Sequence, residues 1–227
     1  MLKDKIYDRK IVEKPWGNEY VIFRNKNKLA VTLLKINYKK KTSLHCHPQK
    51  KTGFIVLDGK AKIQLGLWKQ NSKNYSSPSK LMIRTGLFHS IEAMTKKGVK
   101  ALEFEVPVKK NDLVRFDDNY GRSLKPYEGK NHIKKISIND IVFTKPKIGI
   151  DQNYKVGNSK IKLKVYKSFK NIINKEDSTI FAVIDGSVVD KKNRNTLSIG
   201  DIIQTGTFKK LATRFKIKKE LVLLSVE

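Results

Sequence analysis

Cysteine is almost absent from this chain of 227 residues, in which Cys46 is the single one. One cysteine cannot form an internal disulfide framework or supply the ligands of a zinc ribbon. No apolar run approaches the roughly 20 residues that span a bilayer, and residues 1–6 hold no apolar stretch suited to a secretory signal. We therefore expect a soluble cytoplasmic protein, in a reducing compartment, without a membrane partner.

Acidic residues are also scarce: 21 Asp and Glu stand against 49 Lys and Arg, which gives a net charge of +28. Such a balance suits nucleic acid or phosphorylated ligands as partners. The lysines, however, lie in short pairs along the whole chain, for example at 39–41, 134–135 and 218–219. A nucleic-acid binder concentrates its charge on one helix or stripe. We therefore expect compositional bias and no nucleic-acid partner, while a small anionic ligand fits the charge.

Long helical periodicity is missing, and short runs rich in Val, Ile, Leu and Phe recur between turn signals. This pattern is typical of an all-β sandwich or barrel. From residue 107 to about 150 the chain has more charges and prolines and a less regular alternation. We expect a first β-module at residues 1–110, an ordered connector at 111–150 and a second β-module at 151–227.

An internal repeat supports the two modules. Val56-Leu57-Asp58-Gly59 recurs as Val183-Ile184-Asp185-Gly186, at an offset of 127 residues (183 − 56). Ile83-Arg84-Thr85-Gly86 recurs in part as Ile203-Gln204-Thr205-Gly206, at an offset of 120 residues (203 − 83). Each copy then ends in an apolar strand, so we predict two copies of one module.

Three of the four histidines form a pattern. His45 and His47 flank Cys46, and side chains two positions apart on a strand share a face. A histidine pair on a strand is as often a surface accident as a pair of ligands. Here His89 follows a Thr-Gly turn, as a barrel strand returning past the pair would. We predict that His45, His47 and His89 bind one divalent transition metal (zinc, manganese, iron or nickel), and the sequence does not select among these metals.

At these residues the chain resembles the cupin superfamily. The first cupin motif contains His-x-His, a Glu and a Gly, and His45, His47 and Gly59 match it. The second motif, Pro-x-Gly-x-x-His, is matched by residues 84–89, with Arg84 in the proline position. The resemblance implies an all-β double-stranded β-helix, the jelly-roll cupin barrel. With the repeat, it implies a bicupin.

Longer segments resemble cupins of sugar metabolism. Residues 11–106 are similar to the cupin domain of type II phosphomannose isomerases and mannose-phosphate guanylyltransferases, beginning at Glu13-Lys14-Pro15-Trp16-Gly17. Residues 112–129 look like a segment of cupins linked to sugar and surface-polysaccharide pathways. The resemblance implies a mannose-6-phosphate isomerase-like enzyme, whose metal activates the carbonyl of a sugar or sugar phosphate for isomerisation or epimerisation.

One position departs from the family pattern. Thr52 stands where the family has a carboxylate ligand, and Thr179 repeats it in the second copy. A hydroxyl is a poor replacement for a carboxylate, so the site would hold three histidines with open positions. Glu92, Glu103 or Glu105 could supply a carboxylate instead, and the spacing selects none of them. Glu103 and Glu105 share a strand face, and we expect that face to be exposed to solvent.

The second copy keeps no ligand, because Ile172, Asn174 and Lys209 stand at the positions of the three histidines. We expect its barrel to be degenerate, with a structural or interfacial role.

The connector and the second motif add candidates for substrate binding and proton transfer. Basic side chains that could face an anionic substrate are Arg84, Arg115, Arg122 and Lys125. Side chains that could transfer a proton are Tyr120 and Asp117. The alternative is that the connector packs over the barrel edge through its own salt bridges.

Two other functions stay open beside the isomerase. Thr52 and the degenerate copy favour a non-catalytic cupin that binds a sugar or regulates. A site of three histidines also fits an iron dioxygenase, although no residue selects oxygen chemistry. The expected ligand is small and anionic or sugar-like in each case, and the family resemblance implies a homodimer.

Overall fold

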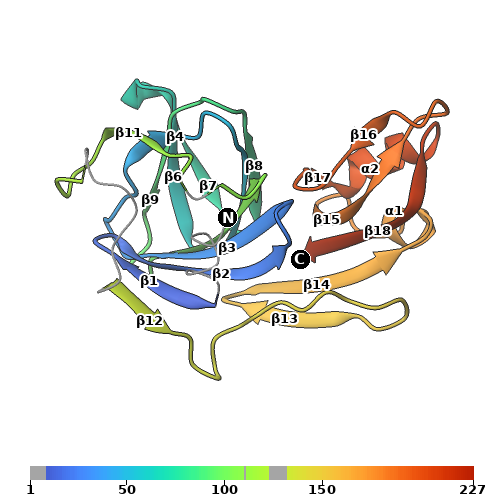
Figure 1. Ribbon diagram of the computed structural model, residues 1–227, viewed down its shortest axis with the longest axis horizontal. Helices are drawn as coiled ribbons and strands as arrows, with labels where there is room; N and C mark the ends of the chain where they lie inside the picture. The colour runs from blue at the N-terminus through green and yellow to red at the C-terminus, as the bar shows by residue number, and fades with distance from the viewer. Residues whose placement is uncertain (1–8, 110, 123–131) are drawn as a thin grey trace. The chain divides into compact units, whose positions relative to one another are not determined.

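A computed structural model describes residues 9–109, 111–122 and 132–227 (Figure 1). The chain divides into two compact units, Met1–Val142 and Phe143–Glu227, so the expected connector at 111–150 is shared between them. The fold is mostly β, with three antiparallel sheets. None of the helices in the described ranges is long and apolar enough to cross a membrane.

Two of the sheets belong to the first unit. The larger has the strand order β12-β1-β2-β3-β10-β5-β8, with bounds β12 (Ile133–Lys135), β1 (Lys10–Lys14), β2 (Gly17–Asn25), β3 (Leu29–Ile36), β10 (Val99–Val106), β5 (Lys51–Asp58) and β8 (Ser79–Ile83). The smaller has the order β11-β4-β9-β6-β7, with bounds β11 (Val114–Asp117), β4 (Leu44–Cys46), β9 (His89–Ala93), β6 (Lys60–Leu65) and β7 (Ser72–Ser76). A short 3₁₀ turn, Lys69–Asn71, joins β6 to β7.

One hydrophobic core lies between these two sheets. Leu34 and Phe54 of the larger sheet pack in the same buried cluster as Ile63 and Ile91 of the smaller sheet. Trp16, 4% exposed, joins this cluster from the turn between β1 and β2. Apolar side chains of β5, β6 and β9 therefore point into the interior of the unit, as the alternation of side chains along a strand allows.

The second unit has one six-stranded sheet and two helices. Its strands are β13 (Gln152–Val156), β14 (Ser159–Tyr166), β18 (Lys216–Val226), β15 (Ile180–Val189) and β16 (Asn195–Leu197) in sheet order, and β17 (Ile202–Gln204) also pairs with β15. The helices are α1 (Lys170–Ile173) and α2 (Thr205–Ala212). Phe181 of β15 packs against Phe208 of α2, with ring centroids 5.4 Å apart.

The internal repeat corresponds to a shared strand order. The first unit runs β2-β3-β10-β5-β8, and the second unit runs β13-β14-β18-β15-β17. The repeated glycines, Gly59 and Gly186, both have φ +84°. A Cβ at Gly59 would lie 2.4 Å from the Gly98 carbonyl oxygen, and one at Gly186 would lie 2.1 Å from that of Glu220. The same close approach between neighbouring strands therefore occurs twice, and glycine alone permits it.

No second barrel forms in residues 143–227, all of which the structure describes. Ile172 and Asn174, at the positions of His45 and His47, lie in and just after α1 rather than on a strand. The repeat of the Thr-Gly turn begins α2 instead. Phe208 and Leu211, three positions apart and therefore neighbours on the helix surface, pack on the core of the second unit. Burial of this apolar stripe favours the helix over a returning strand.

Candidate metal centre

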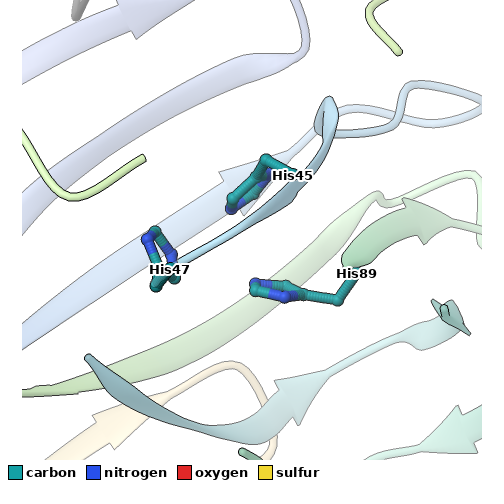
Figure 2. A group of neighbouring side chains, drawn as sticks. All are labelled: His45, His47 and His89. Atoms are coloured by element: carbon teal, nitrogen blue, oxygen red, sulfur yellow. The ribbon is translucent and has the colours of Figure 1, made fainter. Parts of the chain in front are cut away.

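Neighbouring strands of the smaller sheet bring the three predicted ligands together. His45 lies on β4 and pairs in register with His89, the first residue of β9, while His47 follows the end of β4. Figure 2 shows the three imidazoles facing one another. Their ring centroids are 4.5 to 5.4 Å apart, and their ligand atoms lie within 4.8 Å of one another. Such a group can hold a metal ion.

Backbone carbonyl groups orient each imidazole. The Nδ1 of His45 is 2.8 Å from the Ser43 oxygen, and the Nδ1 of His89 is 2.9 Å from the Leu87 oxygen. The Nδ1 of His47 bonds the Asp112 oxygen. A carbonyl oxygen only accepts, so each Nδ1 carries the hydrogen and each Nε2 presents a lone pair. Metal-ligating histidines are held in this way.

Burial keeps the three imidazoles neutral. It lowers the pKa of His45 well below the usual value, helped by the neighbouring His89 and His47. It lowers the pKa of His47 as well, and lowers that of His89 to about 3. The Nε2 atoms of His47 and His89 are buried and find no hydrogen-bond partner among the described residues. Buried lone pairs on neutral imidazoles fit a transition metal.

Asp112 connects two segments of the chain beside the site. Its backbone carbonyl accepts a hydrogen bond from the His47 Nδ1. Its carboxylate accepts hydrogen bonds from the backbone N–H groups of Gln49 and Lys50, at 2.9 and 2.8 Å. These bonds tie the segment after β10 to the turn after His47. The orientation of His47 therefore depends on a residue 65 positions away, which no local pattern in the sequence reveals.

His45 and His47 line a cavity of about 70 Å³ in the first unit. Apolar walls come from Trp16, Leu34, Phe54, Ile91 and Leu113. The charged groups at the cavity are Lys14, Glu19, Lys50, Glu103, Glu105, Arg115 and Arg122. The cavity thus combines two of the candidate metal ligands with charged groups of both signs.

The expected exposure of Glu103 and Glu105 is wrong. β10 is a central strand paired on both sides, by β3 and β5, and these two side chains point to the interior. The Glu103 carboxylate lies 3.9 Å from the His47 Nε2. Lys50, only 2% exposed, donates to Glu105. Glu92 instead lines a separate lysine-rich hollow, so the geometry selects the two carboxylates of β10.

The candidates of the connector are only partly at the cavity. Arg115 and Arg122 line it. Arg122 also donates to Asp118, with Nη2 2.7 Å from Oδ1. Burial acts to raise the pKa of the Asp118 carboxyl, but hydrogen bonds from Arg122 and its positive charge lower this pKa below its usual value. The salt bridge expected under the packing alternative therefore exists, without removing Arg122 from the cavity.

The other candidates lie elsewhere. The Tyr120 hydroxyl donates to the Lys41 carbonyl at 3.2 Å, and Asp117 is exposed at the end of β11. Arg84 is exposed in the turn after β8. None of these three is among the residues that line the cavity. Lys125 lies outside the described residues.

Two buried lysines at the cavity, Lys14 and Lys50, were not predicted from the sequence. Lys14 pairs with Glu19 at 3.5 Å, with side chains 4% and 11% exposed. Its signal was the Lys-Pro-Trp-Gly segment, which places it beside the buried Trp16. Lys50 had no such signal, because lysines in pairs occur throughout this chain.

A family model described as the C-terminal domain of mannose-6-phosphate isomerase matches residues 3–118. The chain belongs to this family. The match confirms the resemblance to phosphomannose isomerase cupins and covers most of the first unit. No curated protein matches the chain.

Three solved structures of low sequence identity are among those similar to this chain. KdgF from Halomonas sp. is 12% identical (TM-score 0.38), with 42% of this chain and 84% of KdgF covered. The capsular polysaccharide assembling protein CapF from Staphylococcus aureus is 15% identical (TM-score 0.41), with 48% of this chain and 34% of CapF covered, so the chain spans about a third of CapF. A conserved protein with a double-stranded β-helix domain from Klebsiella pneumoniae is 14% identical (TM-score 0.41), with 51% and 95% covered.

Proposed function

We propose that the first unit binds one divalent transition metal through the Nε2 atoms of His45, His47 and His89, and isomerises or epimerises a sugar or sugar phosphate. One observation carries the proposal: backbone carbonyls hold the Nδ1 atoms of three buried imidazoles, whose ligand atoms lie within 4.8 Å of one another beside a cavity that His45 and His47 line. Membership of the mannose-6-phosphate isomerase family supports the substrate class.

A divalent metal bound there would act as a Lewis acid on the substrate carbonyl. Arg115 and Arg122 present basic groups at the same cavity, where a guanidinium can bind a phosphate with two parallel hydrogen bonds. Asp118 holds the Arg122 side chain in position. Trp16, Leu34 and Phe54 form apolar walls that limit the entry of water.

Isomerisation of a sugar also requires a proton to move between neighbouring carbons. Glu105 is the group we assign to this step, because its carboxylate lies at the cavity and can accept a proton. Lys50 donates to the same carboxylate and holds it in place. This pair takes the role that the sequence suggested for Tyr120 or Asp117.

Elemental analysis of the purified chain followed by a panel of sugar phosphates tests the proposal. We expect one metal per chain, loss of that metal in His47→Ala, and aldose–ketose conversion visible by NMR. Iron with substrate-dependent oxygen consumption would favour the dioxygenase, and sugar binding without turnover would favour the non-catalytic cupin. A chain that takes up no stoichiometric metal would contradict both the metal-dependent isomerase and the iron dioxygenase.

For the second unit we propose a degenerate copy of the cupin module, with the original metal-binding sheet lost. The shared strand order and the paired glycines support this origin. We further propose that the chain is cytoplasmic and forms a homodimer. Size-exclusion chromatography with light scattering tests the dimer.

A further inference from the structure

We infer that Glu103 supplies the carboxylate that Thr52 lacks, and that it binds the same metal as the three histidines. The inference rests on the proposed function, because it concerns the metal that the function requires. It extends that function by assigning a fourth ligand from a different strand.

The pairing of β5 and β10 explains how one strand can substitute for the other. Thr52 is opposite Glu105 in the register, and Phe54 is opposite Glu103. Residues directly opposite each other, and residues two apart on one strand, point to the same face of a sheet. All four side chains therefore point to the same side, where Glu103, Glu105 and Phe54 line the cavity. A carboxylate on β10 can reach the region where a side chain at position 52 would end.

The distance to His47 fits a shared metal. The Glu103 Oε1 is 3.9 Å from the His47 Nε2. Ligand bonds of about 2.0–2.2 Å place neighbouring ligand atoms about 3–4 Å apart around one ion. His47 belongs to two groups whose ligand atoms lie within 4.8 Å of one another, one with His45 and His89 and the other with Glu103 and Glu105.

The hydrogen bond from Lys50 favours Glu103 over Glu105 as the ligand. The Glu105 carboxylate accepts from the ammonium of Lys50, and this bond occupies a lone pair that a metal would need. The Glu103 Oε1 is the carboxylate oxygen that lies 3.9 Å from the His47 Nε2. Three neutral imidazoles and the Thr52 hydroxyl leave the charge of a divalent ion uncompensated, and a buried charge needs an opposite one.

The test compares Glu103→Gln with Glu92→Gln in the full-length chain. Both changes replace a carboxylate by an amide of the same shape, and Glu92 lies on β9 outside the cavity. We expect Glu103→Gln to weaken zinc binding by at least about 10–100-fold in a chelator competition, and to change the visible absorption spectrum of the cobalt(II) form. Glu92→Gln should match the wild type in both measurements.

Equal zinc affinity and an unchanged cobalt spectrum in Glu103→Gln would overturn the inference and leave the proposed function intact. If the wild type itself binds neither metal, both fail together. Should Glu103→Gln not fold, Glu103→Asp retains the charge on a shorter side chain. A wild-type cobalt spectrum in Glu103→Asp would then overturn the inference, and a shifted spectrum would support it.

Discussion

The two units share five strands in the same order but differ in what faces that sheet. In the first unit a second sheet closes the core, and in the second unit helices α1 and α2 pack there. His45 and His89 lie on the second sheet of the first unit, and His47 directly follows one of its strands. The layer that the second unit lacks is therefore the layer that carries the three histidines. Residues 143–227 hold no counterpart of the candidate metal centre, while the repeat stays visible in the sheet that both units have.

The largest effect should follow from removing a ligand. We expect His89→Ala to weaken metal binding by about 100-fold or more, since even indirect partners of a metal ligand contribute 10–100-fold, and to abolish activity. His132→Ala, which changes an exposed histidine, is the control and should keep both. Calorimetric titration with zinc gives the affinities, and equal values for the two variants would contradict the site.

Phe54 and Phe181 stand at the 127-residue offset of the repeat (181 − 54), and truncating each of them separates stability from metal binding. Phe54 and Phe181 are buried at 2% and 0% exposure, so Phe54→Ala and Phe181→Ala should each lower the free energy of unfolding by about 3–5 kcal/mol. Phe54 also lies against His89, with ring centroids 5.9 Å apart. Only Phe54→Ala should therefore weaken metal binding. Urea unfolding and a zinc titration of each variant measure the two effects, and a metal affinity lowered equally by both would remove the distinction.

As the pH is lowered, the metal-free first unit should lose stability at a higher pH than the second unit. The buried histidines have folded-state pKa values below the ordinary 6.5, about 3 for His89. The unfolded chain then binds more protons, so the free energy of unfolding falls as the pH drops from 6.5 towards 3. Residues 143–227 contain no histidine, and both tryptophans lie in the first unit.

Tryptophan fluorescence therefore reports on the first unit, and hydrogen exchange in β15 and β18 reports on the second. Between pH 6.5 and about 5 we expect a lower urea midpoint by fluorescence with unchanged protection of β15 and β18. Added zinc should reduce the acid effect, because the metal competes with protons for the same nitrogens. Parallel losses in both units would argue against a histidine origin.

The smallest effects concern the repeated glycines. Gly59→Ala and Gly186→Ala place a Cβ against a backbone oxygen at positive φ, so each should cost about 1–3 kcal/mol. Thermal melting of both variants checks this, and Gly86→Ala, with open space around the glycine, shows the cost of positive φ without a clash. Very different costs at Gly59 and Gly186 would weaken the structural equivalence of the copies.

Much of the first unit could be predicted from the sequence because its signals are local. Alternation on a strand placed His45 and His47 on one face, and the Gly86 turn brought His89 back to them. The repeat of Asp58-Gly59 marked a real geometric constraint, since glycine alone tolerates the close approach there. The family resemblance rested on these same short motifs.

The remaining features depend on contacts between distant residues. Glu103 and Glu105 were expected to face solvent because they are charged. Their burial follows from the central position of β10 between β3 and β5. α1 and α2 have 4 and 8 residues, too short for a clear helical period, and packing on the second core decides their conformation. The sequence around Lys50 gives no sign of its tertiary contact with Glu105.

The central claim is that three oriented imidazoles hold one metal ion in the first unit. Its most direct test is the metal content of the intact chain, purified without chelators, reloaded with zinc and dialysed, beside a variant with His45, His47 and His89 all changed to Ala. We predict one equivalent of zinc in the wild type and none in the variant. Zinc retained equally by both, or by neither, would contradict the account.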